Sequence, residues 1–277
     1  MKAIRILGLL LLFLAMLVEA ADQRALKTGV QTLPGALPNI GVKDPALDWS
    51  FDLSQEKFYI SVPRNYTGNQ PFGLLVFISP SDQCIAVPPG WETVLQEKKL
   101  IFVAPQKAGN NQSISRRAGL AVLVAVKLQE MARIDTNRIY AAGLSGGARM
   151  ASYVSFLRPN LFSGVFAVCG VNFARQVPRV KATQNDQYGY FSIDEKLVNE
   201  AKKRVKFVLV TGSKDFRYGN ILDIYTGGFQ KDGYIVKLID VPGMEHTICS
   251  PKALSDGISF LDKKTAATPG KDRQLGL

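Results

Sequence analysis

The feature that most constrains the fold of this chain is a series of short apolar runs separated by segments with helical spacing. The runs at residues 72–78 and 100–104 are continuously apolar, as expected of strands covered on both faces. The same pattern predicts strands at residues 57–62, 138–142, 165–169, 205–210 and 236–241. Helical spacing of apolar residues predicts helices at 117–132, at 147–157, from about 194, and at 253–264. Because strands alternate with helices, the connections must be crossovers, and we expect an α/β fold with a mostly parallel central sheet flanked by helices.

Composition divides the chain into a leader, an arm, a domain and a tail. Residues 1–20 combine a basic start, an apolar centre and a small-x-small end, which is typical of a secretory signal peptide; an uncleaved anchor is the alternative. Residues 21–50 are rich in glycine and proline and are interpreted as an N-terminal arm or linker. We expect one domain over residues 51–264, with residues 172–204 as a lid insertion, and a polar tail over residues 265–277. The leader predicts a secreted or periplasmic protein with no stable membrane insertion after cleavage.

The chain is basic, with a formal net charge of +11. Its lysines and arginines form only short clusters and are not interleaved with aromatic residues, so they are interpreted as solvated helix faces. This pattern argues against a nucleic-acid partner. The oligomeric state does not follow from it.

A G-x-S-x-G pentapeptide, residues 143–147, lies directly between a predicted strand and a predicted helix. In that context the serine, Ser145, sits on a sharp turn that lifts its hydroxyl clear of the sheet, and Gly143 and Gly147 remove β-carbons that would collide. Ser145 is therefore a candidate nucleophile. The N–H of Gly146, at the start of the helix, is a candidate oxyanion donor.

His246 is the only histidine in the chain, and it follows the last predicted strand. Asp215 follows the strand at residues 205–210, where a carboxylate can orient an imidazole; Asp223 and Asp186 are the alternatives. The order serine, aspartate, histidine along the chain is that of the α/β-hydrolase fold. Ser145, Asp215 and His246 are thus predicted to form a catalytic triad, with His246 as the general base.

A second oxyanion donor is expected in the turn after the strand at residues 72–78. Pro80 has no N–H, so Ser81 is the candidate, with Asp82 behind it; an ordinary turn is the alternative.

The three cysteines, Cys84, Cys169 and Cys249, all follow predicted strands or the candidate base. We expect one disulfide, joining Cys249 to either Cys84 or Cys169, with three buried thiols as the alternative. A lone histidine and the lack of C-x-x-C spacing predict no metal site, and the chemistry needs no cofactor.

Residues 138–150, with the sequence Arg-Ile-Tyr-Ala-Ala-Gly-Leu-Ser-Gly-Gly-Ala-Arg-Met, resemble secreted α/β-hydrolases grouped with polyhydroxybutyrate depolymerases and feruloyl or acetylxylan esterases. Asp135 resembles the lead-in seen there. The resemblance implies Ser145 as nucleophile, Asp215 as acid and His246 as base. It also implies a serine hydrolase that cleaves carboxylic esters, of small molecules or polymers, through an acyl-enzyme. In one departure, Ser79-Pro80 stands where such enzymes usually carry His-Gly, and this leaves the substrate open. A serine peptidase on the same fold and a non-catalytic binding protein are the alternative functions.

Overall fold

A single eight-stranded sheet organises the chain. The computed structural model describes residues 26–36, 47, 50–178 and 190–263. The sheet order is β1-β2-β4-β3-β5-β6-β7-β8. The strands are β1 (Gly29–Thr32), β2 (Lys57–Ser61), β3 (Phe72–Ile78), β4 (Leu100–Pro105), β5 (Ile134–Leu144), β6 (Gly164–Val168), β7 (Lys206–Thr211) and β8 (Ile235–Asp240). From β4 to β8 every neighbouring pair is parallel, while β1 and β2 are antiparallel to their neighbours. The predicted mostly parallel α/β sheet is confirmed.

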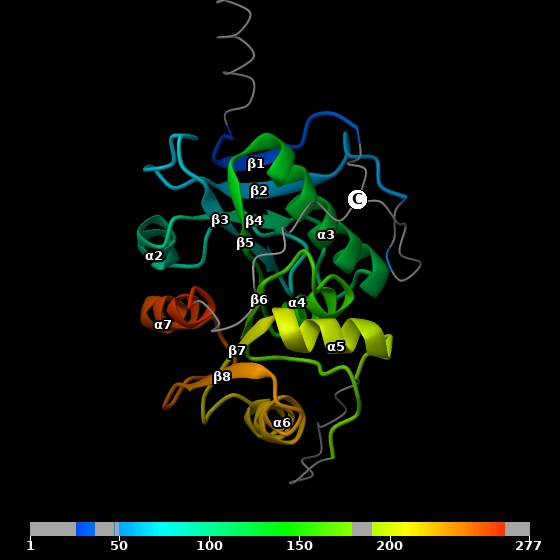
Figure 1. Ribbon diagram of the computed structural model, residues 1–277. Helices are drawn as coiled ribbons and strands as arrows, with labels where there is room; N and C mark the ends of the chain where they lie inside the picture. Colours follow the sequence, from blue (N-terminus) through cyan, green and yellow to red (C-terminus); the bar gives the residue numbers. More distant parts are fainter. Residues whose placement is uncertain (1–25, 37–46, 48–49, 179–189, 264–277) are drawn as a thin grey trace, which may run out of the picture.

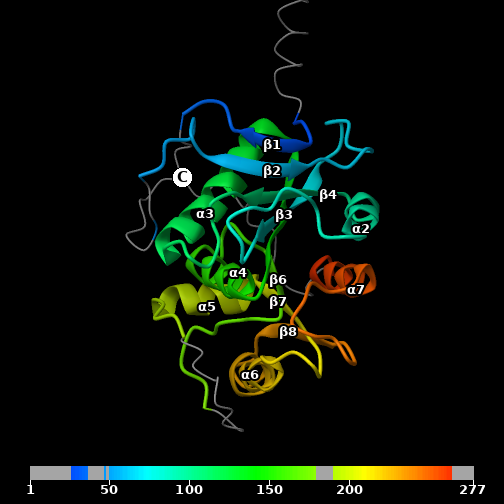
Figure 2. The same cartoon turned by 180° about the vertical axis from the view of Figure 1, so that it is seen from behind.

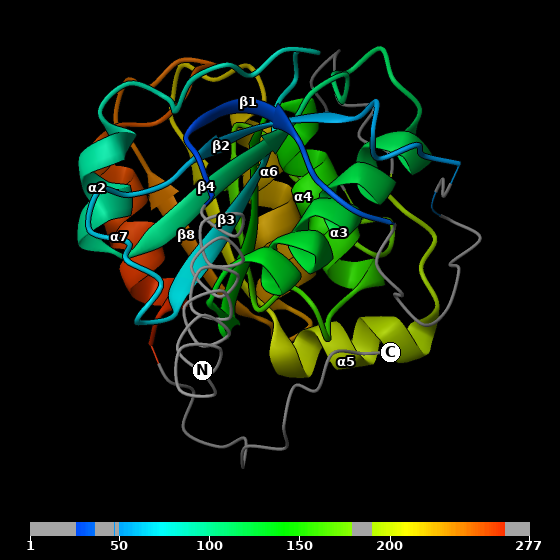
Figure 3. The same ribbon diagram turned by 90° about the horizontal axis from the view of Figure 1, so that it is seen from above.

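Helices cover both faces of the sheet (Figures 1 and 2). One face carries α3 (Ile114–Met131), α4 (Gly146–Leu157) and α5 (Glu195–Arg204). The other carries α2 (Trp91–Glu97) and α7 (Pro251–Leu261), as the view from above shows (Figure 3). Each face has its own buried core: Leu74 and Val76 of β3 pack toward α3 and α4, whereas Leu75 and Phe77 pack toward α2 and α7. This alternation explains why β3 is apolar at every position.

Several elements were not predicted from the sequence. Residues 29–32 of the expected arm form the edge strand β1, which pairs with β2. The short helices α2 and α6 (Tyr218–Ile224) were also missed, as was the π-helical turn over Tyr225–Gln230 that continues α6. All are too short to display a clear helical or strand period, and tertiary packing determines them.

The segment at residues 172–204, expected as a lid, lies between β6 and β7. Residues 179–189 lie outside the described residues, as do the leader, residues 37–46 and the tail. The last part of the segment forms α5, whose Ala201 is buried against the core beside α4. Among the described helices, none combines the length and the apolar character that a membrane span requires.

Candidate active site

Ser145 occupies a strained turn between β5 and α4. Its backbone has φ 55° and ψ −120°, a conformation that costs an L-residue free energy and that persists only where surrounding structure enforces it. A β-carbon on Gly143 would lie 2.4 Å from the backbone carbon of Gly147, and one on Gly147 would lie 1.9 Å from the carbonyl oxygen of Ile78. The two glycines therefore permit the close approach of α4 to the sheet that the turn requires.

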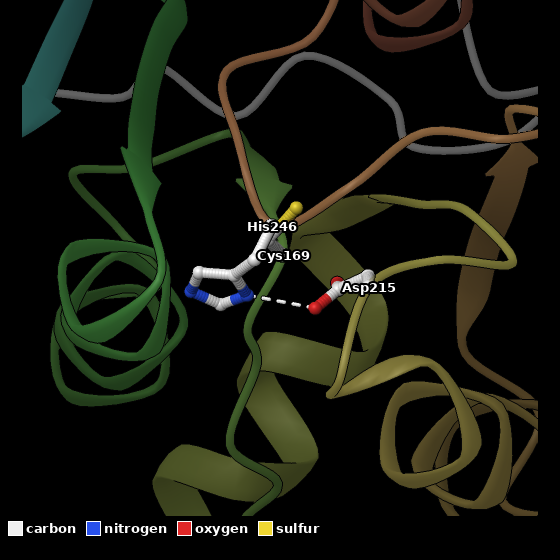
Figure 4. Close-up of side chains that lie close together, drawn as sticks. All are labelled: Cys169, Asp215 and His246. Carbon is white, nitrogen blue, oxygen red and sulfur yellow. Dashed lines mark hydrogen bonds and ion pairs between the residues drawn. The ribbon is translucent and has the colours of Figure 1, made fainter.

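The structure brings Ser145, His246 and Asp215 together at the carboxyl edge of the sheet. His246 Nε2 lies 2.9 Å from Ser145 Oγ, and His246 Nδ1 lies 2.7 Å from Asp215 Oδ1. Figure 4 shows the imidazole and the carboxylate in line, with Cys169 beside them. Ser145 follows β5, Asp215 follows β7 and His246 follows β8. The loops after these three strands therefore meet at the carboxyl edge of the sheet. Asp223 lies on α6, and Asp186 lies outside the described residues.

Asp215 is held as a carboxylate by its hydrogen bonds. Burial by itself would raise its pKa, but bonds from the N–H of Arg217, from His246 and from the hydroxyl of Thr211 outweigh that effect and lower the pKa. The side chain of Asp215 is fully buried, while that of His246 is 20% exposed. A buried anion is therefore available to orient Nδ1–H of His246 and leave Nε2 facing the serine. This tautomer is inferred from the hydrogen bonds.

The loop that carries His246 is anchored from both sides. The thiol of Cys169 donates to the carbonyl of Thr247 at 3.3 Å, and the indole N–H of Trp91 donates to the carbonyl of Cys249 at 3.0 Å. Cys169 follows β6 with a positive φ of 54°, which directs its side chain under the loop. The sequence suggests Cys169 only as a disulfide partner of Cys249, and no motif indicates that its thiol bonds to the histidine loop.

The expected disulfide is wrong: Cys84, Cys169 and Cys249 are all free thiols. The Cys169 sulfur is committed to backbone carbonyls of the histidine loop. Burial raises the pKa of Cys84 to about 11 and that of Cys249 to about 12, so all three thiols are protonated at neutral pH.

The oxyanion side of the site differs from the expectation in one respect. Gly146 opens α4 directly after the nucleophile, at the position from which its N–H is expected to donate to an oxyanion. The N–H of Ser81, the second expected donor, instead donates to Ser79 Oγ at 3.0 Å. To serve an oxyanion, Ser81 would have to give up that hydrogen bond.

Asp82 links the turn after β3 to the loop after β4. Its carboxylate accepts from the N–H of Gly109 at 2.9 Å and from the side-chain amide of Asn111 at 2.9 Å. The N–H of Asn110 donates to the carbonyl of Pro80 at 2.8 Å. The two loops thus form one unit beside the start of α4.

Among the described residues, one group could in principle offer a metal ion three ligand atoms: Cys169, Asp215 and His246. Burial and the nearby Asp215 carboxylate raise the pKa of the Cys169 thiol, which disfavours the thiolate that a metal requires. Each of the three side chains already has a hydrogen-bond partner within the site. The donor set therefore fits proton transfer better than metal binding.

Comparison with known proteins identifies the fold. No protein-family model matches the chain, and no curated protein sequence matches it. Solved structures do match. The serine hydrolase FphF of Staphylococcus aureus, described as fluorophosphonate-binding, is similar with a TM-score of 0.57 and 14% identity, over 76% of this chain and 93% of that one. The S-formylglutathione hydrolase FrmB of Staphylococcus aureus gives 0.56 and 14%, over 74% and 92%.

A third similar structure is LpqC, a poly(3-hydroxybutyrate) depolymerase from Bordetella parapertussis. Its TM-score is 0.51 at 16% identity, over 74% of this chain and 85% of that one. All three structures are hydrolases, and the chain has the α/β-hydrolase fold, as the sequence predicted.

Proposed function

We propose that this protein is a serine hydrolase that cleaves carboxylic esters through a covalent acyl-enzyme. The observation that carries the proposal is the continuous hydrogen-bonded chain from Ser145 Oγ through the imidazole of His246 to the buried carboxylate of Asp215, with distances of 2.9 and 2.7 Å. A strained backbone at Ser145 supports it, because strain of this kind is retained where function requires it.

The first half of the reaction forms the acyl-enzyme. Ser145 Oγ forms a bond to the ester carbonyl carbon while His246 Nε2 takes the hydroxyl proton. The carbonyl π electrons move onto oxygen, and the resulting oxyanion accepts a hydrogen bond from the N–H of Gly146 at the positive end of α4. When the carbonyl re-forms, the bond to the alcohol oxygen breaks, and His246 gives its proton to the departing alcohol.

The second half repeats these steps with water. His246 Nε2 removes a proton from water as the water oxygen bonds to the acyl carbon. The collapse of this second tetrahedral intermediate breaks the bond to Ser145 Oγ, which recovers its proton from His246, and the carboxylic acid leaves. Asp215 stays ionised throughout and stabilises the imidazolium formed in each half.

The substrate class is an ester of a small molecule or of a polymer, and the site of action is outside the cytoplasm. Two observations support this part of the proposal. One of the three similar structures is described as a poly(3-hydroxybutyrate) depolymerase, and poly(3-hydroxybutyrate) is a polymer joined by ester bonds. Residues 1–20 have the pattern of a secretory leader.

The decisive experiment combines active-site labelling with turnover. We expect a fluorophosphonate probe to label the wild type and not Ser145→Ala, and we expect both Ser145→Ala and His246→Ala to lose hydrolysis of a short p-nitrophenyl ester. Ser54→Ala changes an exposed serine far along the chain from the nucleophile and serves as the control, with unchanged labelling. Substantial turnover by either active-site variant would overturn the mechanism. Faster cleavage of peptide amides than of esters would replace the esterase by a peptidase.

A further inference from the structure

The side-chain amide of Asn110 lies directly on Gly146, the residue after the nucleophile. A β-carbon built on Gly146 would meet Asn110 Oδ1 at 2.0 Å, Cγ at 2.7 Å and Nδ2 at 3.0 Å. The amide therefore fills the space that a side chain at residue 146 would occupy. Asn110 comes from the loop after β4, so a residue far from the pentapeptide in sequence lies against the residue that follows the nucleophile.

Arg117 determines which way this amide faces. Its guanidinium donates to Asn110 Oδ1 at 3.1 Å and to the carbonyl of Ala108 at 2.9 Å. A guanidinium has only donors, so the atom it contacts must be the amide oxygen, and the NH₂ group is directed elsewhere. Within the described residues no acceptor is bonded to Asn110 Nδ2, and Asn110 is exposed to solvent.

Neither Pro80 nor Ser81, in the turn expected to supply the second oxyanion donor, offers an unbonded N–H. Gly146 supplies one N–H, Pro80 supplies none, and the N–H of Ser81 is committed to Ser79 Oγ at 3.0 Å. On the basis of the proposed function, we infer that Asn110 Nδ2 donates a hydrogen bond to the oxyanion beside the N–H of Gly146, with Arg117 as the residue that positions it. Sequence reasoning missed both, since neither belongs to a motif.

The contact with Arg117 also strengthens the donor. A cation bonded to the amide oxygen withdraws electron density from the amide, so its N–H groups become better donors. Arg117 is buried, and only 6% of its surface is exposed, so its charge is poorly screened by water. Arg149 lies near enough to repel it and Asp82 near enough to attract it. Burial, reinforced by Arg149, lowers the pKa of Arg117 to about 10, which leaves the guanidinium charged at neutral pH.

The test compares wild type with Asn110→Ala and Asn110→Asp. Loss of one oxyanion donor costs about 10²-fold in kcat, so we expect that loss for Asn110→Ala with KM little changed. The isosteric Asn110→Asp places an anion next to the developing oxyanion and should be at least as impaired. The affinity for a trifluoromethyl ketone, which forms an oxyanion on Ser145, should fall by the same factor as kcat/KM, whereas a merely structural role would not link the two.

Asn111→Ala is the matched control. Asn111 is the next residue of the same loop, is also exposed, and holds Asp82 rather than lying on Gly146. We expect it to retain kcat within about threefold. The inference is overturned if Asn110→Ala keeps wild-type kcat, or if Asn111→Ala loses as much as Asn110→Ala. Fluorophosphonate labelling of the wild type tests the proposed function separately. If Ser145 is not labelled, the serine mechanism itself is contradicted; if it is labelled and Asn110→Ala keeps full activity, only the role of Asn110 is contradicted.

Discussion

Phe216 lies against the imidazole of His246, with ring centroids 4.1 Å apart and an angle of 31° between the planes. Phe216 directly follows Asp215, so one loop supplies both the carboxylate at the edge of the imidazole and an aromatic ring on its face. The guanidinium of Arg217 lies 5.2 Å from the Phe216 ring centroid. Phe216 is 58% exposed, so its ring covers the imidazole at the surface of the protein.

We predict that Phe216→Ala lowers kcat/KM by about 2- to 10-fold, the range that corresponds to the loss of one aromatic pair. Without the ring, the imidazole gains freedom to leave the line between Asp215 and Ser145. Because Phe216 is exposed, the free energy of unfolding should change little. Phe216→Tyr keeps the ring and should retain activity; equal loss in both variants would contradict a stacking role. Steady-state kinetics with a soluble ester measure the effect.

Asp215→Asn should lower kcat by about 10⁴-fold, because the amide NH₂ can donate to Nδ1 of His246, which favours the wrong tautomer, and because a neutral amide does not stabilise the imidazolium. The fold should tolerate the change in size. In wild type the pKa of Asp215 is lowered below its ordinary value of 3.8, so the carboxylate stabilises the folded state. That contribution is fully present above about pH 4 and is lost as the pH falls through the lowered pKa.

Urea unfolding of wild type and Asp215→Asn at several pH values tests this sign. Wild type should have the larger free energy of unfolding at pH 7. The difference in this free energy between wild type and Asp215→Asn should shrink below pH 4. A difference that grows toward acid would contradict the lowered pKa.

The parts of the structure that follow from local pattern were predictable from the sequence. The strand at residues 72–78 was predicted with the bounds it has, because both of its faces are buried and its apolar run is continuous. The turn at Ser145 could be placed because Gly143 and Gly147 mark the close approach of α4 to the sheet. The position of Asn110 against Gly146 could not be predicted, because it depends on how the loop after β4 packs against the start of α4. The disulfide was wrong for a related reason: loop positions after strands do not give the distance between two sulfur atoms.

Cys169 should act as a positioning residue for His246. Its thiol donates to the carbonyl of Thr247, and its sulfur, an Asp215 oxygen and a His246 nitrogen all lie within 4.8 Å of one another. We predict that Cys169→Ala lowers kcat several-fold by loosening the histidine loop, while Cys169→Ser, which keeps a donor, restores most of it. KM should be unaffected in both. If Cys169→Ala is as active as wild type, Cys169 does not position His246.

The number of free thiols in the protein can be measured directly. Denatured protein without reductant should react with three equivalents of Ellman's reagent, whereas a disulfide would leave one. In the native protein the reaction at pH 8 should be slow. Even Cys84, the least buried of the three, has a pKa raised to about 11 and so carries about one thiolate per thousand molecules.

Gly146 and Gly147 are neighbours at the start of α4. We predict that alanine at residue 147 destabilises the fold, whereas alanine at residue 146 mainly lowers activity. At Gly147 a β-carbon would lie 1.9 Å from the carbonyl oxygen of Ile78, a backbone atom of a buried strand that cannot yield. Gly147→Ala should therefore lower the free energy of unfolding by more than about 2 kcal/mol. At Gly146 the obstacle is the side-chain amide of Asn110, which is exposed and can move into solvent once its hydrogen bond from Arg117 is broken.

Gly146→Ala should consequently unfold in urea within about 1 kcal/mol of wild type. Its kcat should nevertheless fall toward that of Asn110→Ala, since the new methyl group displaces the amide. The double variant Asn110→Ala/Gly146→Ala should be no slower than Asn110→Ala alone, because the amide that the methyl group would displace is already absent. Additive losses in the double variant would mean that the methyl group at residue 146 impairs catalysis by another route, such as by shifting the N–H of Gly146.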